Sequence, residues 1–273
     1  MRKNSLLIIG AITAWLSFSA CEIKFKPGET SMANNYEIKR YDRLESRYLT
    51  TGDFSALQQM NTDYPIETRT LIEKMLQLGT ITDPSISNTF LMFYQDTTLQ
   101  VLIADAEAEY ADMSDINAEL KGAFERLQKW LPAIKLPTVY AQIGALDQSI
   151  VVGDSSIGIS LDKYMGEEYP LYKRFYTKQQ RATMTRPYIV PDCITFYLLS
   201  LYPMRGFDHC PQLERDLHMG KIMWATNKAV GREVFSTPYT HTISCYMKHN
   251  PNVTVQQLLE MNDDSAIKTH HKE

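Results

Sequence analysis

The sequence predicts an α+β fold that is predominantly α-helical, with a small central β-hairpin or sheet. Two observations predict this class. Apolar residues recur at intervals of three and four before residue 132 and again from about residue 186 to 230. Between these regions, residues 136–143 and 148–161 form two short runs rich in β-branched residues. Helices that flank one small sheet give an α+β organisation.

The N-terminal residues predict an export signal. Arg2 and Lys3 precede an apolar run of about 15 residues, which is shorter than the roughly 20 that a membrane span needs. The small-residue site Phe18-Ser19-Ala20 then directly precedes Cys21, and the whole is typical of a signal peptide over residues 1–20. An ordinary signal peptide, or an anchor helix with a chance cysteine, is the alternative.

The string "FSAC" resembles the lipobox of bacterial lipoproteins, in which the cysteine is acylated and becomes the first residue. We therefore expect lipidation of Cys21 and attachment to a membrane through that lipid. Residues 21–35 are polar, contain Pro and Gly and lack periodicity, so they are predicted to be a tether. Residues 36–273 are predicted to be a single α+β domain with a weakly ordered C-terminal tail.

Composition limits the class of partner. With 44% hydrophobic and 22% charged residues, the chain is predicted to be globular. A net charge of -4 with dispersed Lys and Arg argues against nucleic acid as a partner. The 16 tyrosines suit half-buried surfaces, where a ring is covered and a hydroxyl stays hydrated.

Individual elements follow from local patterns. The apolar stripe over residues 114–131 predicts a helix with Ser114 or Asp115 as N-cap and Pro132 as its stop. Residues 148–161 predict two strands around the turn "GDSS". Further helices are expected over the ranges 65–79, 83–96, 186–203, 210–230 and 253–261, whereas residues 232–252 give a weak pattern and the last dozen residues are expected to be frayed.

Ser155 in "VVGDSSIG" raises the possibility of a serine hydrolase. That chemistry also requires a histidine with an aspartate three residues before it, and the pairs Asp208-His209 and Asp216/His218 have the wrong spacing. A hairpin turn explains the same residues without catalysis.

Metal and cysteine chemistry are also weakly indicated. The six histidines include no HExxH, so neither a bound metal nor another cofactor is predicted. Beyond Cys21 there are three cysteines, Cys193, Cys210 and Cys245. They could form one disulfide with a spare thiol, or all three could be buried and reduced, and we favour the second alternative.

The segment after the predicted hairpin is the candidate for partner binding. Loops at the end of a sheet often carry binding residues. The alternative is that its tyrosines pack over the sheet edge and that Asp192 simply begins a helix. The candidate residues are Asp162, Tyr164, Glu168, Tyr169, Tyr172, Arg186 and Asp192.

Three segments of the same region carry a family resemblance. "IGISLDKYMGEEYPLYK", "RPYIVPDCITFYL" and "LHMGKIMWA" resemble the gliding-motility lipoprotein family GldB of Bacteroidetes, and the resemblance extends to about Ala229. It implies an envelope lipoprotein associated with gliding and with the linked protein secretion system, without an established enzymatic activity. The C-terminal part departs from the family pattern.

The chain is also distantly similar to zinc peptidase-like proteins that carry HExxH in a comparable helix. On that similarity, Pro191 and Thr195 stand at the histidine positions and Asp192 at the glutamate position. Neither Pro nor Thr offers an imidazole, so the similarity implies a degenerate zincin-like fold without its metal.

Together these observations predict a non-catalytic interaction or structural component of a gliding-motility or associated secretion assembly. It is expected in the cell envelope, facing the periplasm, with the outer membrane as the favoured site and other envelope proteins as partners. The alternatives are a periplasmic peptidase-like enzyme and a chaperone for exported chains.

Overall fold

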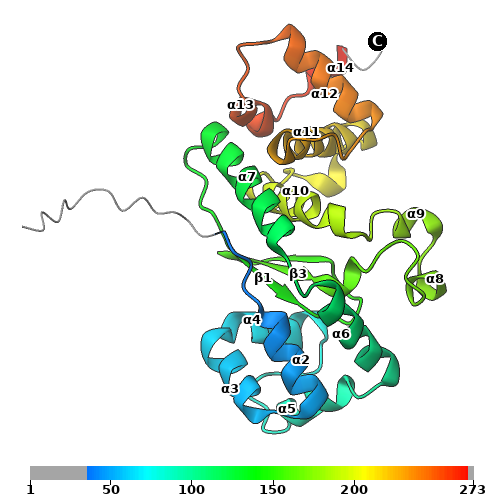
Figure 1. Cartoon of the computed structure of the whole chain (residues 1–273). Coiled ribbons are helices and arrows are strands. Elements are labelled where there is room, and N and C mark those ends of the chain that lie inside the picture. Colours follow the sequence, from blue (N-terminus) through cyan, green and yellow to red (C-terminus); the bar gives the residue numbers. More distant parts are fainter. Residues whose placement is uncertain (1–35, 270–273) are drawn as a thin grey trace, which may run out of the picture. The chain divides into compact units, whose positions relative to one another are not determined.

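A computed structural model of the chain describes residues 36–269 (Figure 1). The predicted signal peptide, the lipidation site Cys21 and the tether lie outside the described residues. Among the helices within that range, none combines the length and the apolar character that crossing a bilayer would require.

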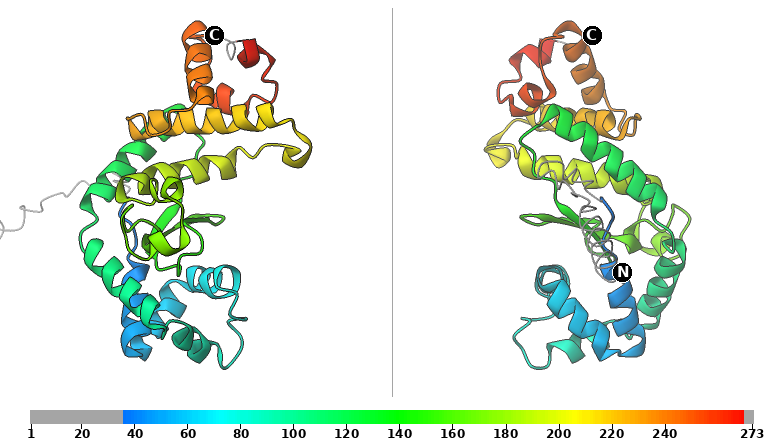
Figure 2. Two further views of the ribbon diagram at one scale, coloured as in Figure 1. Left: turned by 90° about the vertical axis from the view of Figure 1, so that its right-hand side faces the viewer. Right: turned by 60° about the vertical axis from the view of Figure 1, so that its left-hand side comes forward.

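The described residues form a three-stranded sheet between two groups of helices, which confirms the predicted helix-rich α+β class. One group, α2 to α6, lies on one side of the sheet in Figures 1 and 2, and α7, α10 and α11 lie on the other. The first group and α7 have the bounds α2 Tyr41–Thr51, α3 Phe54–Asp63, α4 Pro65–Arg69, α5 Ile86–Phe93, α6 Thr97–Glu109 and α7 Ser114–Trp130.

The sheet has the order β1-β3-β2, with β1 at Thr138–Gln142, β2 at Ile150–Val152 and β3 at Ser156–Ser160. The predicted hairpin is confirmed, because β2 and β3 are antiparallel across the turn at residues 153–155. β1 runs parallel to β3, with Tyr140 opposite Gly158. The connection between β1 and β2 therefore carries the chain around β3, and its first residues, 143–146, become the centre of the site described below.

The helices after the sheet agree with the predicted ranges. α10 (Ile189–Leu201) packs between the sheet and α11 (Gln212–Val230), and α11 contacts α7. α8 (Tyr172–Phe175) and α9 (Lys178–Arg181) are two short turns that precede α10. The predicted helix over residues 65–79 is α4 followed by a π-helical turn, Thr70–Met75.

The N-terminus of α7 differs in detail from the prediction. Ser114 is the first helical residue rather than the cap, and the residue before it, Met113, makes no side-chain cap. Asp112 instead accepts hydrogen bonds from the backbone N–H of Ser114 at 2.8 Å and from its hydroxyl at 3.0 Å. An Asp side chain two residues upstream satisfies one of the free N–H groups of the first turn.

The C-terminal region is more regular than its sequence pattern indicated. Within the weakly patterned range 232–252, α12 (Pro238–His249) begins with a capping box between Thr237 and Thr240. α13 is Val255–Glu260 and α14 is Ser265–Lys268. Ile267 on α14 is fully buried, and residues 270–273, the end of the segment expected to be frayed, lie outside the described range.

One continuous apolar core runs through both helical groups and the sheet. Many of the tyrosines belong to this core rather than to half-buried surfaces. The largest fully buried side chains include Tyr41, Tyr48, Tyr94, Tyr110, Tyr164 and Tyr172. A buried phenol requires a hydrogen-bond partner, so these residues fix contacts between distant segments as well as filling volume.

The three cysteines in the described range are free thiols. Cys193 on α10 is buried as expected, and burial raises its pKa to about 12. Cys210 and Cys245 are partly exposed, so the expectation that all three are buried holds for Cys193 alone.

Gly158 should tolerate no side chain. A Cβ there would lie 2.6 Å from Cζ of the buried Tyr140 ring, so we expect Gly158→Ala to lower the unfolding free energy by about 1–3 kcal/mol. In contrast, Gly122→Ala on α7 should raise it by about 0.5–1 kcal/mol, because its Cβ would meet only the flexible Arg126. Urea denaturation of both variants measures this, and equal stability of the Gly158→Ala protein would contradict the close packing.

Candidate functional site

The predicted partner-binding segment begins where β3 ends, and its first acid is a structural anchor. Asp162 is fully buried in a short 3₁₀ turn, Leu161–Lys163. Its carboxylate accepts hydrogen bonds from the backbone N–H groups of Gly144 at 2.7 Å and Leu146 at 2.6 Å. Burial raises the pKa of Asp162, and these two N–H groups oppose that rise.

The segment that Asp162 holds has an uncommon backbone. Ala145 and Leu146 have φ values of 50° and 64°, in the left-handed region that residues with a Cβ rarely adopt. Such a conformation persists only when surrounding contacts favour it. On the side of β3, the hydrogen bonds from the N–H groups of Gly144 and Leu146 to the Asp162 carboxylate provide such contacts.

A second buried carboxylate, on α2, contacts the same segment from the side of the α2–α6 group. Glu45 on α2 accepts the N–H of Ile143 at 2.8 Å, and the hydroxyl of Tyr94 donates to the carbonyl of Ile143 at 2.7 Å. The other carboxylate oxygen of Glu45, Oε1, is buried without a hydrogen-bond partner. Burial raises the pKa of Glu45 well above its usual value, and the nearby Asp42 and Asp162 carboxylates raise it further.

Two of the predicted tyrosines hold the backbone after β3. The hydroxyl of Tyr172 accepts the N–H of Met165 at 3.0 Å and donates to the carbonyl of Asp162. The hydroxyl of Tyr164 donates to the Asp192 carboxylate on α10 at 2.9 Å. Burial raises the pKa of Asp192 to about 6, although the hydrogen bond from Tyr164 acts to lower it. Asp192 thus ties α10 to the end of the sheet.

We call the hydrogen-bonded residues 143–146 and 161–165, together with Asp192, the anchored base. Residues 166–184, which we call the projecting loop, leave this base and return to it. The N–H of Gly166 donates to the carbonyl of Met184 at 3.0 Å, and Met165 pairs with Thr185 as an isolated bridge. α8 and α9 lie inside the loop and stand beside the sheet in Figure 1.

Two polar side chains tie the loop and the residues just after it to α6 and α7, which belong to different helical groups. The hydroxyl of Tyr169 donates to Asp105 on α6 at 2.8 Å. Just after the loop, Arg186 binds both carboxylate oxygens of Asp115, at 2.9 and 2.7 Å, and its guanidinium lies 5.1 Å from the centre of the Tyr110 ring. A bidentate pair of this kind fixes orientation as well as position.

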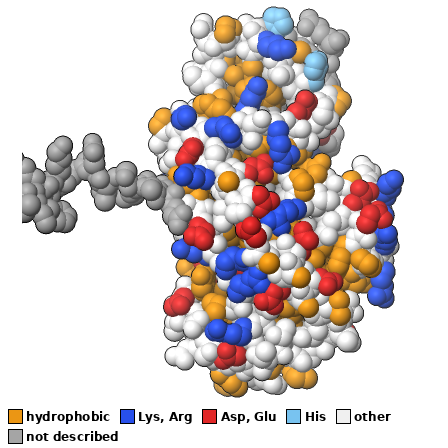
Figure 3. All heavy atoms as spheres, in the orientation of Figure 1, with side chains coloured by type: hydrophobic (Ala, Val, Ile, Leu, Met, Phe, Trp, Pro, Cys, Tyr) orange, Lys and Arg blue, Asp and Glu red, His pale blue; other side chains and the backbone are white. Residues whose placement is uncertain are grey.

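The exposed face of the projecting loop is basic with one large apolar side chain. Phe175 is 64% exposed, and Lys173, Arg174 and Lys178 beside it are exposed. Figure 3 shows Lys and Arg side chains along the outer edge of this region. Glu168, whose side chain is 74% exposed, pairs with Lys173 at 2.6 Å.

The seven candidate residues therefore divide into two roles. Asp162, Tyr164 and Tyr172 are buried and bind other groups of the protein, and the partly exposed Tyr169, Arg186 and Asp192 make such bonds as well. Glu168 is the candidate whose side chain is largely in solvent. The structure gathers six of them into the base of one loop and sets Glu168 on its surface.

Sequence reasoning missed Asp105 and Asp115 as the partners of Tyr169 and Arg186. It also missed Glu45, which binds Ile143 beside the site. Glu45 gave a usable signal, because it occupies the buried stripe of α2 together with Tyr41 and Leu49. An acid on an apolar helix face indicates a buried partner.

The other candidate chemistries lie elsewhere. Ser155 sits in the exposed hairpin turn, and no histidine is among the residues that line the two surface hollows it borders. Thr195, at a position that the peptidase similarity assigns to a histidine, is buried and hydrogen-bonded to Thr226 on α11 at 3.1 Å. No group of three or more potential metal ligands is found within residues 36–269.

A sequence profile described as gliding motility protein GldB matches residues 23–236, well over half of the chain. The chain belongs to this family. No curated protein and no solved structure matches it.

The GldB family match confirms the resemblance inferred from the sequence and covers the whole anchored base and the projecting loop. It identifies the chain as a gliding-motility lipoprotein by family. The match ends at residue 236, just before α12, so α12 to α14 lie outside the matched range.

The buried Glu45 predicts a pH-dependent stability. An unfolded Glu has a pKa of about 4.3, and the folded pKa is higher, so the native state retains a proton that the unfolded state loses. The contribution of Glu45 to the unfolding free energy should therefore fall as pH rises from about 4 through neutrality. Glu45→Gln should flatten this fall and be more stable than the parent at pH 8 by about 1–3 kcal/mol.

Urea denaturation between pH 4 and 8 tests the Glu45 prediction. Glu125→Gln, an exposed position on α7, is the matched control and should follow the parent at every pH. An unchanged pH slope in Glu45→Gln would show that this carboxyl does not titrate differently in the two states.

The Tyr164–Asp192 bond gives a second prediction. Tyr164→Phe removes the donor that favours the charged carboxylate, so the pKa of Asp192 should rise above about 6. Carboxyl ¹³C NMR measures this directly. Tyr169→Phe, which removes a hydroxyl from Asp105 instead, should leave the Asp192 titration unchanged, and a common shift in both variants would argue against a local effect.

Proposed function

We propose that this GldB-family protein is a non-catalytic interaction component of a gliding-motility or associated protein-secretion assembly, anchored to the envelope by lipid on Cys21. The observation that carries the proposal is the family match over residues 23–236. The lipobox-like string before Cys21 supports the anchor, with the domain facing the periplasm and the outer membrane as the favoured site.

The projecting loop is the proposed partner surface. Its base is fixed by buried hydrogen bonds that the Asp162 carboxylate accepts and the Tyr172 hydroxyl donates, and its ends are joined by backbone pairing. A surface loop on a rigid base loses little conformational entropy on binding. The buried candidate residues then act as positioning residues. The residues that contact an envelope protein are Glu168, Phe175 and the basic side chains beside them.

The enzyme and chaperone alternatives predict different observations. A peptidase-like enzyme would require a catalytic group in an accessible hollow, and stoichiometric zinc in the purified protein would support it. A chaperone for exported chains would contact many unrelated proteins rather than a few. The anchored loop favours a defined partner over both, because a fixed surface selects by shape and charge.

In-cell photo-crosslinking tests the partner surface. A photoreactive residue at Phe175 should yield a small, recurrent set of envelope proteins identified by mass spectrometry. Ile66 on α4 is the matched control, because it is 66% exposed against 64% for Phe175, and it should not yield the same set. Cys21→Ala should reduce the crosslinks at Phe175 strongly by removing the chain from the membrane.

Phe175→Ala provides the complementary loss-of-contact test. Its side chain is exposed, so the unfolding free energy should change by no more than about 0.5 kcal/mol while partner recovery falls. Crosslinks to many unrelated exported chains at both positions would contradict the proposal and favour the chaperone hypothesis.

A further inference from the structure

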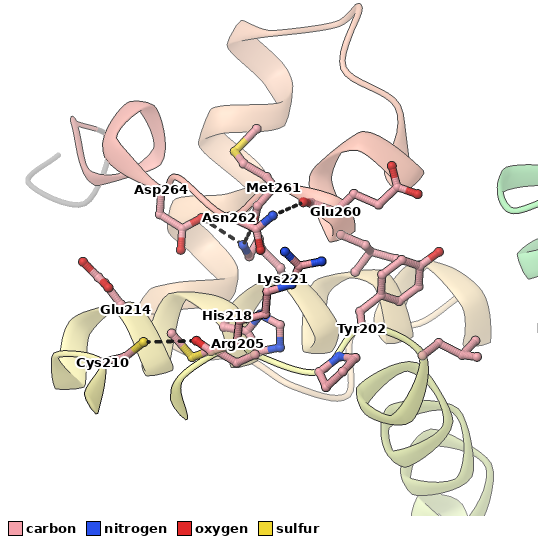
Figure 4. A pocket seen from close by; sticks show the side chains of 14 residues that line it. Tyr202, Arg205, Cys210, Glu214, His218, Lys221, Glu260, Met261, Asn262 and Asp264 are labelled. Atoms are coloured by element: carbon pink, nitrogen blue, oxygen red, sulfur yellow. Dashed lines mark hydrogen bonds and ion pairs between the residues drawn. The ribbon is translucent and has the colours of Figure 1, made fainter. Parts of the chain in front are cut away.

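A pocket of about 540 Å³ lies between the C-terminal end of α10, the first half of α11 and the segment that links α13 to α14 (Figure 4). Its size falls within the range of roughly 300–1,000 Å³ that small-molecule sites occupy. It lies apart from the projecting loop, and the residues that line it come from the range 201–264.

A buried ion pair forms one side of this pocket. Nζ of Lys221 donates to Oδ1 of Asp264 at 2.9 Å and to the carbonyl of Met261 at 2.7 Å. Both charged side chains are almost fully buried, with exposed fractions of 2% and 6%. These bonds hold residues 261–264 as a fixed wall over α11.

His218, one turn before Lys221, has an unsatisfied nitrogen. The residue is 9% exposed, and its Nε2 is buried without a hydrogen-bond partner. Burial and the positive charge of Lys221 lower its pKa, so the ring is neutral at neutral pH. The ring donates a hydrogen bond to the backbone of Tyr202, which leaves Nε2 as an acceptor with a free lone pair.

Such an acceptor requires a donor. An unpaired buried polar atom costs about 1–3 kcal/mol, and native proteins rarely keep one without water, an ion or a ligand beside it. His218 lines the pocket, and a small rotation of its ring would bring the buried Nε2 to the pocket surface, where a bound molecule supplies the donor.

The rest of the lining indicates what kind of molecule this is. Met204, Leu259 and Met261 give an apolar wall. Arg205 at the rim is exposed and has no carboxylate partner among residues 36–269. A guanidinium matches a carboxylate in a two-bond geometry, so this rim is suited to an anionic end group.

Three acidic residues also line the pocket, and they differ in how far the protein neutralises their charge. Asp264 is paired with Lys221, and Glu214 is paired with Lys268 at 2.9 Å. Oε1 of Glu260 accepts a hydrogen bond from Gln256 at 2.8 Å. Lysines therefore neutralise Asp264 and Glu214, whereas Glu260 and Arg205 each keep a charge without an ion-pair partner among residues 36–269.

We propose that this pocket binds the carboxyl-terminal residue of a peptide, or an N-acylated amino acid of the same chemistry, with an apolar side chain. The carboxylate binds Arg205, the side chain packs on Met204, Leu259 and Met261, and an amide N–H donates to Nε2 of His218. The exposed rim side chains shift rotamer to admit the ligand, as interface side chains commonly do.

This inference goes beyond the proposed function and is independent of it. The wall at residues 259–264 lies after residue 236, where the family match ends. The pocket is therefore completed by a part of the chain outside the matched family region, and its ligand would be a property of this chain.

NMR of the histidine rings tests the proposal. The probes are N-acetyl-Leu-Leu and its C-terminal amide, added to about 10 mM to the chain from residue 21 onward carrying Cys21→Ser. His218→Phe assigns the His218 signals by their loss. We expect the free acid to shift the His218 resonances in a saturable manner, and the amide to bind about tenfold more weakly or worse.

Arg205→Gln should weaken binding of the free acid by about tenfold or more, because it removes the charge from an exposed side chain without disturbing the core. Arg69→Gln, whose arginine side chain is 57% exposed on α4, is the matched control and should bind as the parent does. No shift of His218 with either probe would overturn the proposal. Equal binding of acid and amide, or of the Arg205→Gln and parent proteins, would also overturn it.

Discussion

The fold of the candidate site depends on the contact between the Asp162 carboxylate and two backbone N–H groups, those of Gly144 and Leu146. This contact joins the end of β3 to the residues that leave β1, and it supports the left-handed conformation of Ala145 and Leu146. Because β1 and β3 are parallel neighbours, their C-terminal ends meet at one edge of the sheet. The acid lies where that edge would otherwise leave buried N–H groups unpaired.

The same edge also receives Glu45 from α2, and the carboxylate of Asp162 is close enough to raise the pKa of Glu45. Asp162 has two N–H donors, whereas Glu45 has one and keeps an unpartnered oxygen. The physical consequence is an asymmetric pair, in which Glu45 is the carboxyl that favours the protonated state. The α2–α6 group and the sheet are thus coupled by polar contacts that depend on pH, within an otherwise apolar core.

The anchored base explains how a partner surface can arise from residues that never touch a partner. Tyr164, Tyr172 and Arg186 fix the backbone on either side of the projecting loop, and the loop then presents Phe175 and its basic neighbours to solvent. Residues 157–173, one of the segments on which the family resemblance was inferred, include Asp162, Tyr164 and Tyr172, which hold the base. Such a pattern follows when the shape of a surface depends on the hydrogen bonds beneath it.

The sequence by itself determined the elements whose causes are local. The stripe of α7 and the turn at residues 153–155 follow from neighbours within a few positions, because periodicity and turn chemistry are short-range properties. The resemblance to the GldB family follows from the order of several segments along the chain. The tertiary structure decided which polar groups are buried and what they bind. Glu45 meets Ile143 across 98 residues and Arg186 meets Asp115 across 71, and no local pattern encodes such pairings. It also decided the order of the C-terminus, because the Lys221–Asp264 pair and the burial of Ile267 stabilise residues whose own pattern is weak.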